Sequence, residues 1–448
     1  MVRYQQIHYD IKQDILNKKL KQGQRLPSIT TISKTYQCSK GTVIKALDLL
    51  CQQHIIFSKP QSGYYVSDNL IREEFVHTKG YDLTTGNPLV DSFPTADIKN
   101  CLHLATELYA KYSLDITLRG ADSLNAILAS YLANDGVYAK SENIHLVQGI
   151  TQMLTFLTLA PFPNGKETIL IEEPSYSYYI DFLKSVDADV LTIPRDEFGI
   201  DLQLLETYFK TKDIKFFYTI PRNHNPLGTS YSYHQRKKIM ELALKYDVYI
   251  VEDDYFGNAH KLSKYVPIHF FSYQKNCIYL RSFSKEFPFI RIGIVVIPTA
   301  FVEAFEHISS QSYYYSYHIP ALVSQATLEA YIKSSIYVKH TKRINQAVTK
   351  KLQLIKTIIN DWNSNDVKLI GANSGFYFTL QLHPRINTDH LISQLEMKNV
   401  YTSSNKNAFY QQKHYDNSIR LSISQVSLQQ LEEALSIIYE TLGAIISS

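Results

Sequence analysis

The stretch SFSKEFPFIRIG (residues 282–293) places one lysine, Lys285, just after two serines and before an apolar segment, with Arg291 six residues further on. A lone S-x-S-K is usually a solvated loop. Here it follows NCIYLR (276–281), an apolar run that predicts a buried β-strand. The stretch therefore predicts a strand that delivers a lysine and an arginine to the edge of a sheet.

Helix-like and strand-like patterns alternate before this stretch. The predicted helices are ADIKNCLHLATELYAKY (96–112), SLNAILASYLAND (123–135) and ITQMLTFLTLA (150–160), and the predicted strands are IHLVQG (144–149), ETILIEEP (167–174), KFFYTIP (215–221) and DVYIVEDDYF (247–256). Such alternation is typical of a largely parallel α/β sheet covered on both faces. Ligands of these sheets bind outside the carboxyl ends of the strands.

Polar and aromatic residues follow the predicted strands in a regular order. Each alone is typical of an ordinary turn, and their co-occurrence is what points to a site. In chain order they are Gly149, Ile150, Thr151, Tyr176, Asn225, Asp253, Asp254, Tyr255, Ser282, Ser284, Lys285 and Arg291.

This set of side chains fits pyridoxal phosphate. An aldehyde cofactor is held by a lysine as a Schiff base, and its pyridine nitrogen needs a carboxylate partner. Lys285 is the predicted Schiff-base residue, as an internal aldimine, with Asp253 beside the nitrogen and Asp254 as the alternative. The other assignments are Asn225 and Tyr255 for the phenolate oxygen, Tyr176 for the ring, and Gly149, Ile150, Thr151, Ser282, Ser284 and Arg291 for the phosphate.

Length and composition limit the number of domains and the class of protein. A chain of 448 residues predicts two or three domains, and 45% hydrophobic with 20% charged residues is typical of a globular protein. No apolar run approaches the roughly 18 residues that cross a bilayer, and the polar N-terminus is not a signal peptide. Four separated cysteines give no zinc motif. We therefore expect a cytoplasmic protein without a metal site.

Charge is divided unevenly along the chain. Residues 1–66 hold ten Lys and Arg against three acids, a net charge of +7, whereas the remainder is at −3. A small basic head on a mildly acidic body suggests that the head meets a polyanion.

The head has a helix-turn-helix pattern. Ile7, Ile11, Ile15 and Leu20 recur at helical spacing before KQGQ, and ITTISKTY (29–36) and KGTVIKALDLLCQQ (40–53) predict two more helices. The start of the second helix of such a pair enters the DNA major groove. IIFSKPQSGYYV (55–66) predicts a hairpin, or wing. The predicted DNA-binding residues are Arg25, Ser28, Ser39, Lys40, Thr42, Lys45 and Lys59, with both serines also predicted as helix caps.

Residues 4–66 resemble the winged helix-turn-helix of GntR-type regulators through LPS, CSKGTV and SGYYV in that order. In that family an arginine usually stands two residues after LPS and another after the turn serine. This chain has Thr30 and Lys40 there. A lysine keeps a phosphate contact but not bidentate guanine readout, so the operator does not carry over.

Residues 81–448 resemble class I/II aminotransferases, the fold-type I transferases that bind pyridoxal phosphate. The resemblance rests on GITQ, EEPSY, NHNPLG, EDDY, SFSK and, near the end, SIRLSIS. It implies a large and a small subdomain, favours Asp253 over Asp254 as the pyridine partner, and implies that Arg420 binds a substrate α-carboxylate.

The whole chain thus resembles the MocR/GabR type of bacterial regulator. The implied organisation is a DNA-binding domain at 1–67, a linker at 68–80 and a sensing and dimerising body at 81–448. The implied function is binding of promoter DNA by a head-to-tail homodimer, controlled by an amino compound or by the cofactor itself. Two alternatives stay open: a working aminotransferase with an accessory head, and a regulator whose body has lost the cofactor.

Overall fold

The computed structural model describes residues 3–17, 19–21, 23–52, 55–59, 62–67, 80–86, 89, 95–109, 119–257, 265–316, 319–362 and 365–447. The predicted linker, apart from Gly80, and the side chains of the aromatic run 312–318 lie outside this description. The chain divides into two compact units, Met1–Gly80 and Tyr81–Ser448, called here the head and the body.

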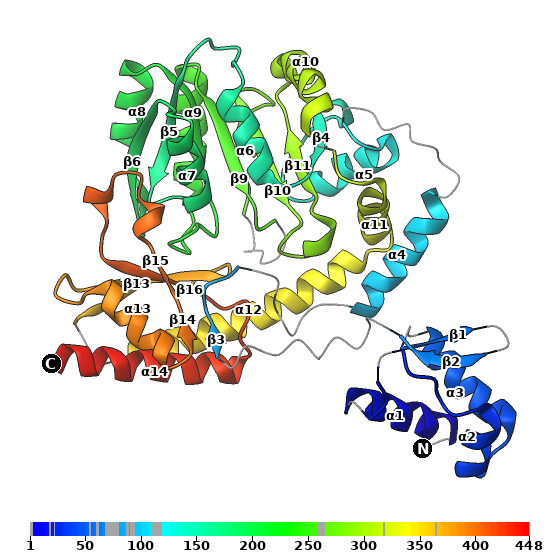
Figure 1. The fold of residues 1–448 in the computed structure, drawn as a ribbon. Helices are drawn as coiled ribbons and strands as arrows, with labels where there is room; N and C mark the ends of the chain where they lie inside the picture. The colour runs from blue at the N-terminus through cyan, green and yellow to red at the C-terminus, as the bar shows by residue number, and fades with distance from the viewer. Residues whose placement is uncertain are drawn as a thin grey trace. The chain divides into compact units, whose positions relative to one another are not determined.

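The head contains the three helices and the hairpin that the sequence predicts (Figure 1). They are α1 (Arg3–Leu16), α2 (Ile29–Thr35), α3 (Lys40–Gln52), β1 (Ile56–Lys59) and β2 (Gly63–Val66), with the two strands paired antiparallel. One detail differs from the sequence prediction, which placed Leu20 in the helical repeat of the first helix. Helix α1 ends at Leu16, and Leu20 packs against the head core from the turn that follows. The amides of Lys19 and Leu20 both bond to the carbonyl of Asp14, which closes that turn.

Both predicted caps are present. Ser28 Oγ accepts from the amide of Thr31 at 3.1 Å, and Ser39 Oγ accepts from the amide of Thr42 at 3.2 Å. These bonds satisfy backbone donors that a helix start leaves without an intrahelical partner. The starts of α2 and α3 are thereby both capped, and Ser39 lies where the turn between the two helices ends.

The large sheet of the body has the order β4-β11-β10-β9-β8-β5-β6-β7. Its strands are β4 (Ile144–Val147), β5 (Thr168–Glu173), β6 (Val190–Asp196), β7 (Gly199–Ile200), β8 (Ile214–Thr219), β9 (Tyr249–Asp254), β10 (Cys277–Ser282) and β11 (Gly293–Val296). The central pairs from β10 to β6 are parallel, as predicted. Strand β11, which the sequence patterns do not single out, runs antiparallel to both β10 and β4.

Helices cover both faces of this sheet (Figure 1). Alternate residues of one strand show this, because Ile169 and Ile171 pack with α6 and α7 whereas Leu170 packs with α8 and α9. The helices of this part are α4 (Thr95–Tyr109), α5 (Asp122–Ala133), α6 (Ile150–Leu159), α7 (Ser177–Ser185), α8 (Leu202–Thr211), α9 (Tyr233–Lys245), α10 (Thr299–Ser316) and α11 (Leu322–Lys333).

A smaller subdomain follows, as predicted. Its sheet has the order β12-β13-β16-β15, and β3 pairs with β14 beside it. The elements are α12 (Ile336–Asn360), β12 (Val367–Gly371), β13 (Tyr377–Leu382), α13 (Thr388–Met397), β14 (Val400–Tyr401), β15 (Ser403–Ser404), β16 (Ser418–Ser422), α14 (Leu428–Ser447) and, from the start of the body, β3 (Tyr81–Asp82). These elements share one apolar core.

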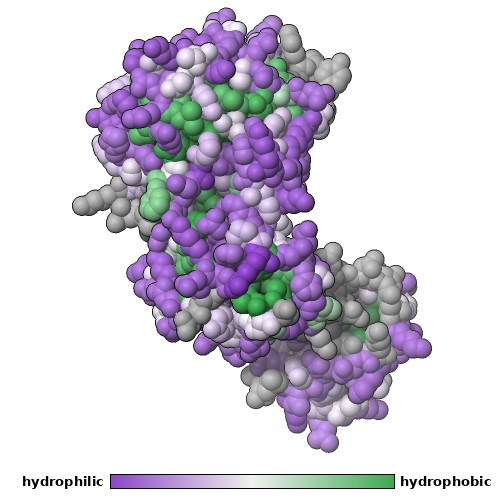
Figure 2. Space-filling view, turned by 90° about the vertical axis from the view of Figure 1, so that its left-hand side faces the viewer, coloured by the Kyte–Doolittle hydropathy of each residue, from purple (hydrophilic) through white to green (hydrophobic). Residues whose placement is uncertain are grey.

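Hydrophilic residues cover most of the face of the body seen in Figure 2, with hydrophobic residues in separate areas between them. Among the described residues, no helix is both long enough and apolar enough to cross a membrane.

Candidate functional site

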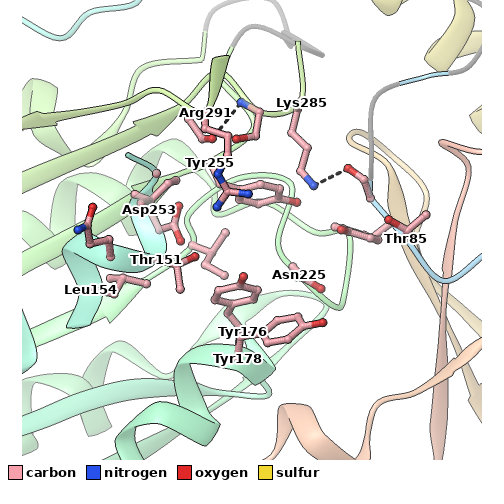
Figure 3. Close-up of a pocket in the computed structure, with 18 of the residues that line it drawn as sticks. Thr85, Thr151, Leu154, Tyr176, Tyr178, Asn225, Asp253, Tyr255, Lys285 and Arg291 are labelled. Carbon is pink, nitrogen blue, oxygen red and sulfur yellow. Dashed lines mark hydrogen bonds between the residues drawn. The ribbon is translucent and has the colours of Figure 1, made fainter. Parts of the chain in front are cut away.

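A cavity of about 510 Å³ lies in the body where the strands β4, β9 and β10 end (Figure 3). Apart from the alternative acid Asp254, its lining includes the residues that the sequence analysis assigns to a cofactor or to a carboxylate: Gly149, Ile150, Thr151, Tyr176, Asn225, Asp253, Tyr255, Ser282, Ser284, Lys285, Arg291 and Arg420. The strand-end rule therefore brings residues far apart in the sequence to one place. The lining also contains residues that sequence reasoning missed, chiefly Thr84, Thr85, Gly86, Gln148, Gln152, Tyr178, Tyr377 and Ser403.

Lys285 follows β10 and points across the cavity (Figure 3). Its Nζ donates a hydrogen bond to the carbonyl of Gly86, and it lies 5.7 Å from the ring centre of Tyr255 and 5.9 Å from that of Tyr377. A Cβ on residue 86 would lie 1.8 Å from Tyr377 Oη and 2.9 Å from Lys285 Nζ, so glycine is required for this close approach.

Asp253 is the second-last residue of strand β9 and is 4% exposed. Its Oδ2 accepts from Tyr218 Oη at 2.7 Å, whereas its Oδ1 is buried with no hydrogen-bond partner among the described residues. Burial raises the pKa of this carboxyl to about 7, against the opposing effect of the Tyr218 hydrogen bond. A buried carboxylate oxygen without a donor fits a ligand that brings a donor or a cation.

Asp254, the alternative partner in the sequence, has a different role. Arg222 donates to both of its oxygens at 2.6 Å, and Tyr279 donates a third bond at 2.5 Å. Asp254 does not line the cavity. Its carboxylate is already satisfied, which leaves Asp253 as the acid that faces the ligand space.

The start of α6 forms one end of the cavity. Gly149 has a φ of 107°, a conformation that favours glycine, and it places the amides of the first helical turn at the cavity. Ser282 and Ser284 adjoin it, with the Ser284 amide donating to Ser282 Oγ at 3.1 Å. Arg291 points into the same region and is solvent-exposed (Figure 3).

Tyr176 and Tyr255, which the sequence analysis assigns to the cofactor, both line the cavity. Tyr176, at the start of α7, lies on the opposite side of the cavity from Lys285 (Figure 3). The sequence predicts that the Tyr255 hydroxyl donates to a ligand, but here it donates to the carbonyl of Asn223 at 2.6 Å. The left-handed backbone of Asn223, with a φ of 52°, belongs to the turn that carries this carbonyl.

Arg420 lies on β16 and reaches the cavity from the small subdomain. Its Nη1 donates to Asn225 Oδ1 at 3.0 Å, and its Nη2 donates to the carbonyl of Thr84 at 2.6 Å. Its Nε is buried with no partner among the described residues, and the guanidinium carbon lies 4.7 Å from the ring centre of Tyr377. A guanidinium that is held in place and has one N–H group without a partner among the described residues is suited to binding a carboxylate.

Residues 83–86 form a short strap over the cavity, and each of its four carbonyls accepts a hydrogen bond. Two bonds come from Lys285 and Arg420, as above. The amide of Ser422 donates to Leu83 O at 2.8 Å, and Ser424 Oγ donates to Thr85 O at 2.6 Å. The strap is thus held by the cations that a ligand would use.

A fully buried polar cluster supports the loop that carries Asn225. Glu172 accepts from Arg195 at 2.5 Å, from Thr219 at 2.6 Å and from the amide of Ile220 at 3.0 Å. Burial alone would raise the pKa of Glu172, but Arg195 beside it holds that pKa well below the usual range. Burial, with Arg195, also lowers the pKa of His224 to about 4, so this histidine is neutral. The sequence shows Glu172, Arg195 and Thr219 only as isolated polar positions in strands, and His224 as a loop residue.

The predicted DNA-binding residues lie on the head. Ser28, Ser39 and Thr42 are engaged in capping bonds, whereas Lys40 and Lys45 are exposed on α3. Lys45 Nζ lies 4.4 Å from the ring centre of Tyr4, and Lys59, at the end of β1, lies 4.8 Å from that of Tyr65. Arg25 lies beside the hairpin, 3.4 Å from the position that a Cβ of Gly63 would take.

Two family models match the chain. Residues 78–438 match Aminotransferase class I and II, and residues 3–66 match Bacterial regulatory proteins, gntR family. The chain is 33% identical to the HTH-type transcriptional regulator YcxD of Bacillus subtilis, over 99% of this chain and 100% of YcxD. It is 22% identical to the HTH-type transcriptional regulator YjiR of Escherichia coli, over 99% of each.

Solved structures share the fold of the body. The multiple substrate aminotransferase from Thermococcus profundus superposes with a TM-score of 0.74 at 24% identity, covering 82% of this chain and 92% of that one. The predicted transferase fold of the body is therefore confirmed.

Proposed function

Because the chain belongs to the GntR-type regulators that carry an aminotransferase class I and II domain, the MocR/GabR type, we propose that it controls transcription in response to a small ligand bound in the body. The head would bind promoter DNA, and a homodimer would present two heads. Since promoter DNA would be its partner, the protein would act in the cytoplasm.

The ligand site of the body would hold pyridoxal phosphate, on which the aminotransferase class I and II family depends in general. The observation that carries this proposal is the unpartnered Oδ1 of Asp253, buried at the far end of a cavity that also holds Lys285 and a helix N-terminus. When bound, the cofactor supplies an aldehyde that condenses with primary amines. Lys285 would hold that aldehyde, Asp253 would face the pyridine nitrogen, and the start of α6 with Arg291 would hold the phosphate.

The effector would be an amino compound that carries a carboxylate. Arg420 supports this, because its unpartnered Nε and its position at the cavity suit a carboxylate better than a neutral group. A primary amine would compete with Lys285 for the aldehyde, so an amine is a chemically natural signal. A regulator needs a ligand that shifts its conformational populations and persists, so slow turnover is expected.

Lys285→Ala tests the cofactor assignment. We expect the purified variant to lose the visible absorption that added pyridoxal phosphate produces in the wild-type protein. When the wild-type protein with bound cofactor is reduced by borohydride and its peptides are mapped, the cofactor should be found attached to Lys285. A label on another lysine would show that this assignment is wrong. Lys275→Ala, a matched change of a lysine that does not line the cavity, should behave as the wild type.

Arg420→Ala tests the effector site. It should abolish the change in DNA binding caused by amino acids while leaving the cofactor absorption intact. The titration uses pyridoxal phosphate first and then L-glutamate, L-alanine and γ-aminobutyrate. A full response to the cofactor alone, unchanged in the variant, would refute the carboxylate role. Rapid, catalytic conversion of these compounds to their oxo acids, with an added α-keto acid as the amino acceptor, would instead favour a working aminotransferase.

DNA binding is tested with the region upstream of the protein's own gene. Binding should weaken steeply as salt rises, since each phosphate contact contributes about 0.9 to the slope of log affinity against log salt. Binding that survives deletion of residues 1–66, or that is insensitive to salt, would contradict the role of the head.

A further inference from the structure

The exposed face of α3 contains two residues that the head itself does not require. Val43, Ala46, Leu47 and Leu50 point into the core and are fully buried. Over residues 40–51 of the helix, where burial is described, the exposed residues are Lys40, Gly41, Ile44, Lys45 and Asp48. The basic residues fit the phosphates of DNA, as proposed above, but a glycine and an isoleucine in the same face need a separate reason.

Ile44 is 39% exposed, although isoleucine is among the residues most often buried in proteins. It lies one turn into the helix, one residue before Lys45 and one turn after Lys40. A single exposed apolar side chain is ordinary by itself. In this place, however, it lies on the part of the second helix that enters the major groove in helix-turn-helix proteins.

Gly41 is not explained by the fold of the head. A Cβ added there would meet only Ser39 Oγ, at 3.8 Å, and the residue does not have the left-handed backbone that favours glycine. Alanine would fit and is the better helix former. Glycine at such a position leaves room for something outside the chain to approach the helix backbone.

Gly41 and Ile44 are three residues apart and therefore neighbours on one helix face. Together they form a shallow apolar notch: the glycine leaves the space and the isoleucine forms one wall. The apolar group that a base pair presents in the major groove is the C5-methyl of thymine. Asp48, one turn beyond Ile44, would repel phosphates, so the DNA-facing part of α3 ends close to this notch.

We propose that the notch formed by Gly41 and Ile44 receives a thymine methyl, and that Ile44 is a determinant of operator sequence. This inference rests on the proposed DNA binding by the head. The exposed face of α3 has no arginine, its exposed lysines are assigned above to phosphates, and the Thr42 hydroxyl lies 2.9 Å from Ser39 Oγ in the cap. The contact that remains for reading a base there is apolar, and each half-site of the operator would carry thymine at that position.

Replacing thymine by deoxyuridine tests the proposal, because it removes only the methyl group. A bound duplex is first selected from random sequence with the full-length protein, and each thymine in it is then replaced singly. One methyl is worth roughly a fourfold change in affinity, from about 0.8 kcal/mol per buried methylene. We expect one thymine in each half-site at which the wild-type protein loses about fourfold.

In Ile44→Ala the same replacement should have no effect on affinity. Tyr9→Ala removes an exposed apolar side chain from α1 and should keep the full sensitivity of the wild type. The proposal is overturned if no thymine methyl matters to the wild type, or if Ile44→Ala keeps the fourfold loss. If the full-length protein selects no duplex at all, the proposed DNA binding itself fails, which is a distinguishable result.

Gly41→Ala tests the notch because it should raise the thermal stability of the head but lower the affinity for DNA. Alanine should stabilise the head slightly, which thermal unfolding of the full-length protein measures, because it favours the helix. It should weaken binding to the selected duplex by about tenfold, because overpacking by one methyl costs about 1–3 kcal/mol. Unchanged or stronger DNA binding in Gly41→Ala would overturn the notch.

Discussion

Asp253→Asn should make the cofactor-free protein more stable at high pH while weakening its hold on the cofactor. The wild-type carboxyl is buried, its Oδ1 has no partner among the described residues, and burial raises its pKa to about 7. An ionised carboxylate in that place is costly until a ligand supplies a cation or a donor. Asparagine keeps an oxygen to accept from Tyr218 and carries no charge.

The size of the effect follows from linkage. An unfolded aspartate titrates near pH 3.9, so between about pH 4 and pH 7 the folded protein binds more protons than the unfolded one. Stability contributed by this group is therefore lost as pH rises through that window. The penalty is about 1.5 kcal/mol at pH 5 and about 4 kcal/mol at pH 8. Asp253→Asn should remove it, so its stabilising effect should be about 2.5 kcal/mol larger at pH 8 than at pH 5.

Urea unfolding of cofactor-free wild type and variant at both pH values measures this difference, and contributions from other titrating groups cancel in the comparison. Added pyridoxal phosphate should then stabilise the wild type more than the variant, because it binds the wild type more tightly. An Asp253→Asn protein that is equally stabilised at pH 5 and pH 8, or destabilised at pH 8, would refute the reasoning.

Three further predictions concern the strap, a buried ion pair and the head. Gly86→Ala should prevent the strap from seating and reduce cofactor binding in an absorbance titration, and adding Tyr377→Phe, which removes the atom 1.8 Å from the new Cβ, should partly restore it. Arg222→Met should lower the free energy of unfolding, measured with urea, by about 3–5 kcal/mol, because it leaves the Asp254 charge buried without a cation. As a control, Lys245→Met breaks an exposed ion pair and should have a much smaller effect on that free energy. Lys40→Ala should reduce the salt slope of DNA binding by about 0.9 and weaken all sequences alike, as measured by titration at several salt concentrations.

The cofactor side of the cavity was predictable because it follows a topological rule. Asp253 lies at the carboxyl end of β9 and Lys285 lies three residues beyond that of β10, and parallel strands bring such positions to one edge. The strand pattern alone does not choose between Asp253 and Asp254, although the two point to opposite faces, and only the resemblance to class I/II aminotransferases favoured Asp253. The choice became visible only with Arg222, which comes from another strand end and pairs with Asp254.

The strap was missed for a different reason. Gly86 and Lys285 are 199 positions apart, and no local pattern marks the three residues Thr84, Thr85 and Gly86 as part of a site. Their contacts depend on how β3 joins the small subdomain through β14, which is a long-range pairing. Strand β11 is an apolar run of the kind a buried strand has, but its antiparallel pairing with β10 and β4 is a long-range feature that the local pattern does not show.

The strap also affects how tightly the body can hold a ligand. Its carbonyls already engage Lys285 and Arg420, so an incoming ligand exchanges one set of hydrogen bonds for another. The net free energy of ligand binding would then be the difference between the hydrogen bonds made to the ligand and those lost from the strap. This difference is small even when each single bond is strong. A modest affinity permits rapid release, and site occupancy then follows the ligand concentration as it falls as well as when it rises.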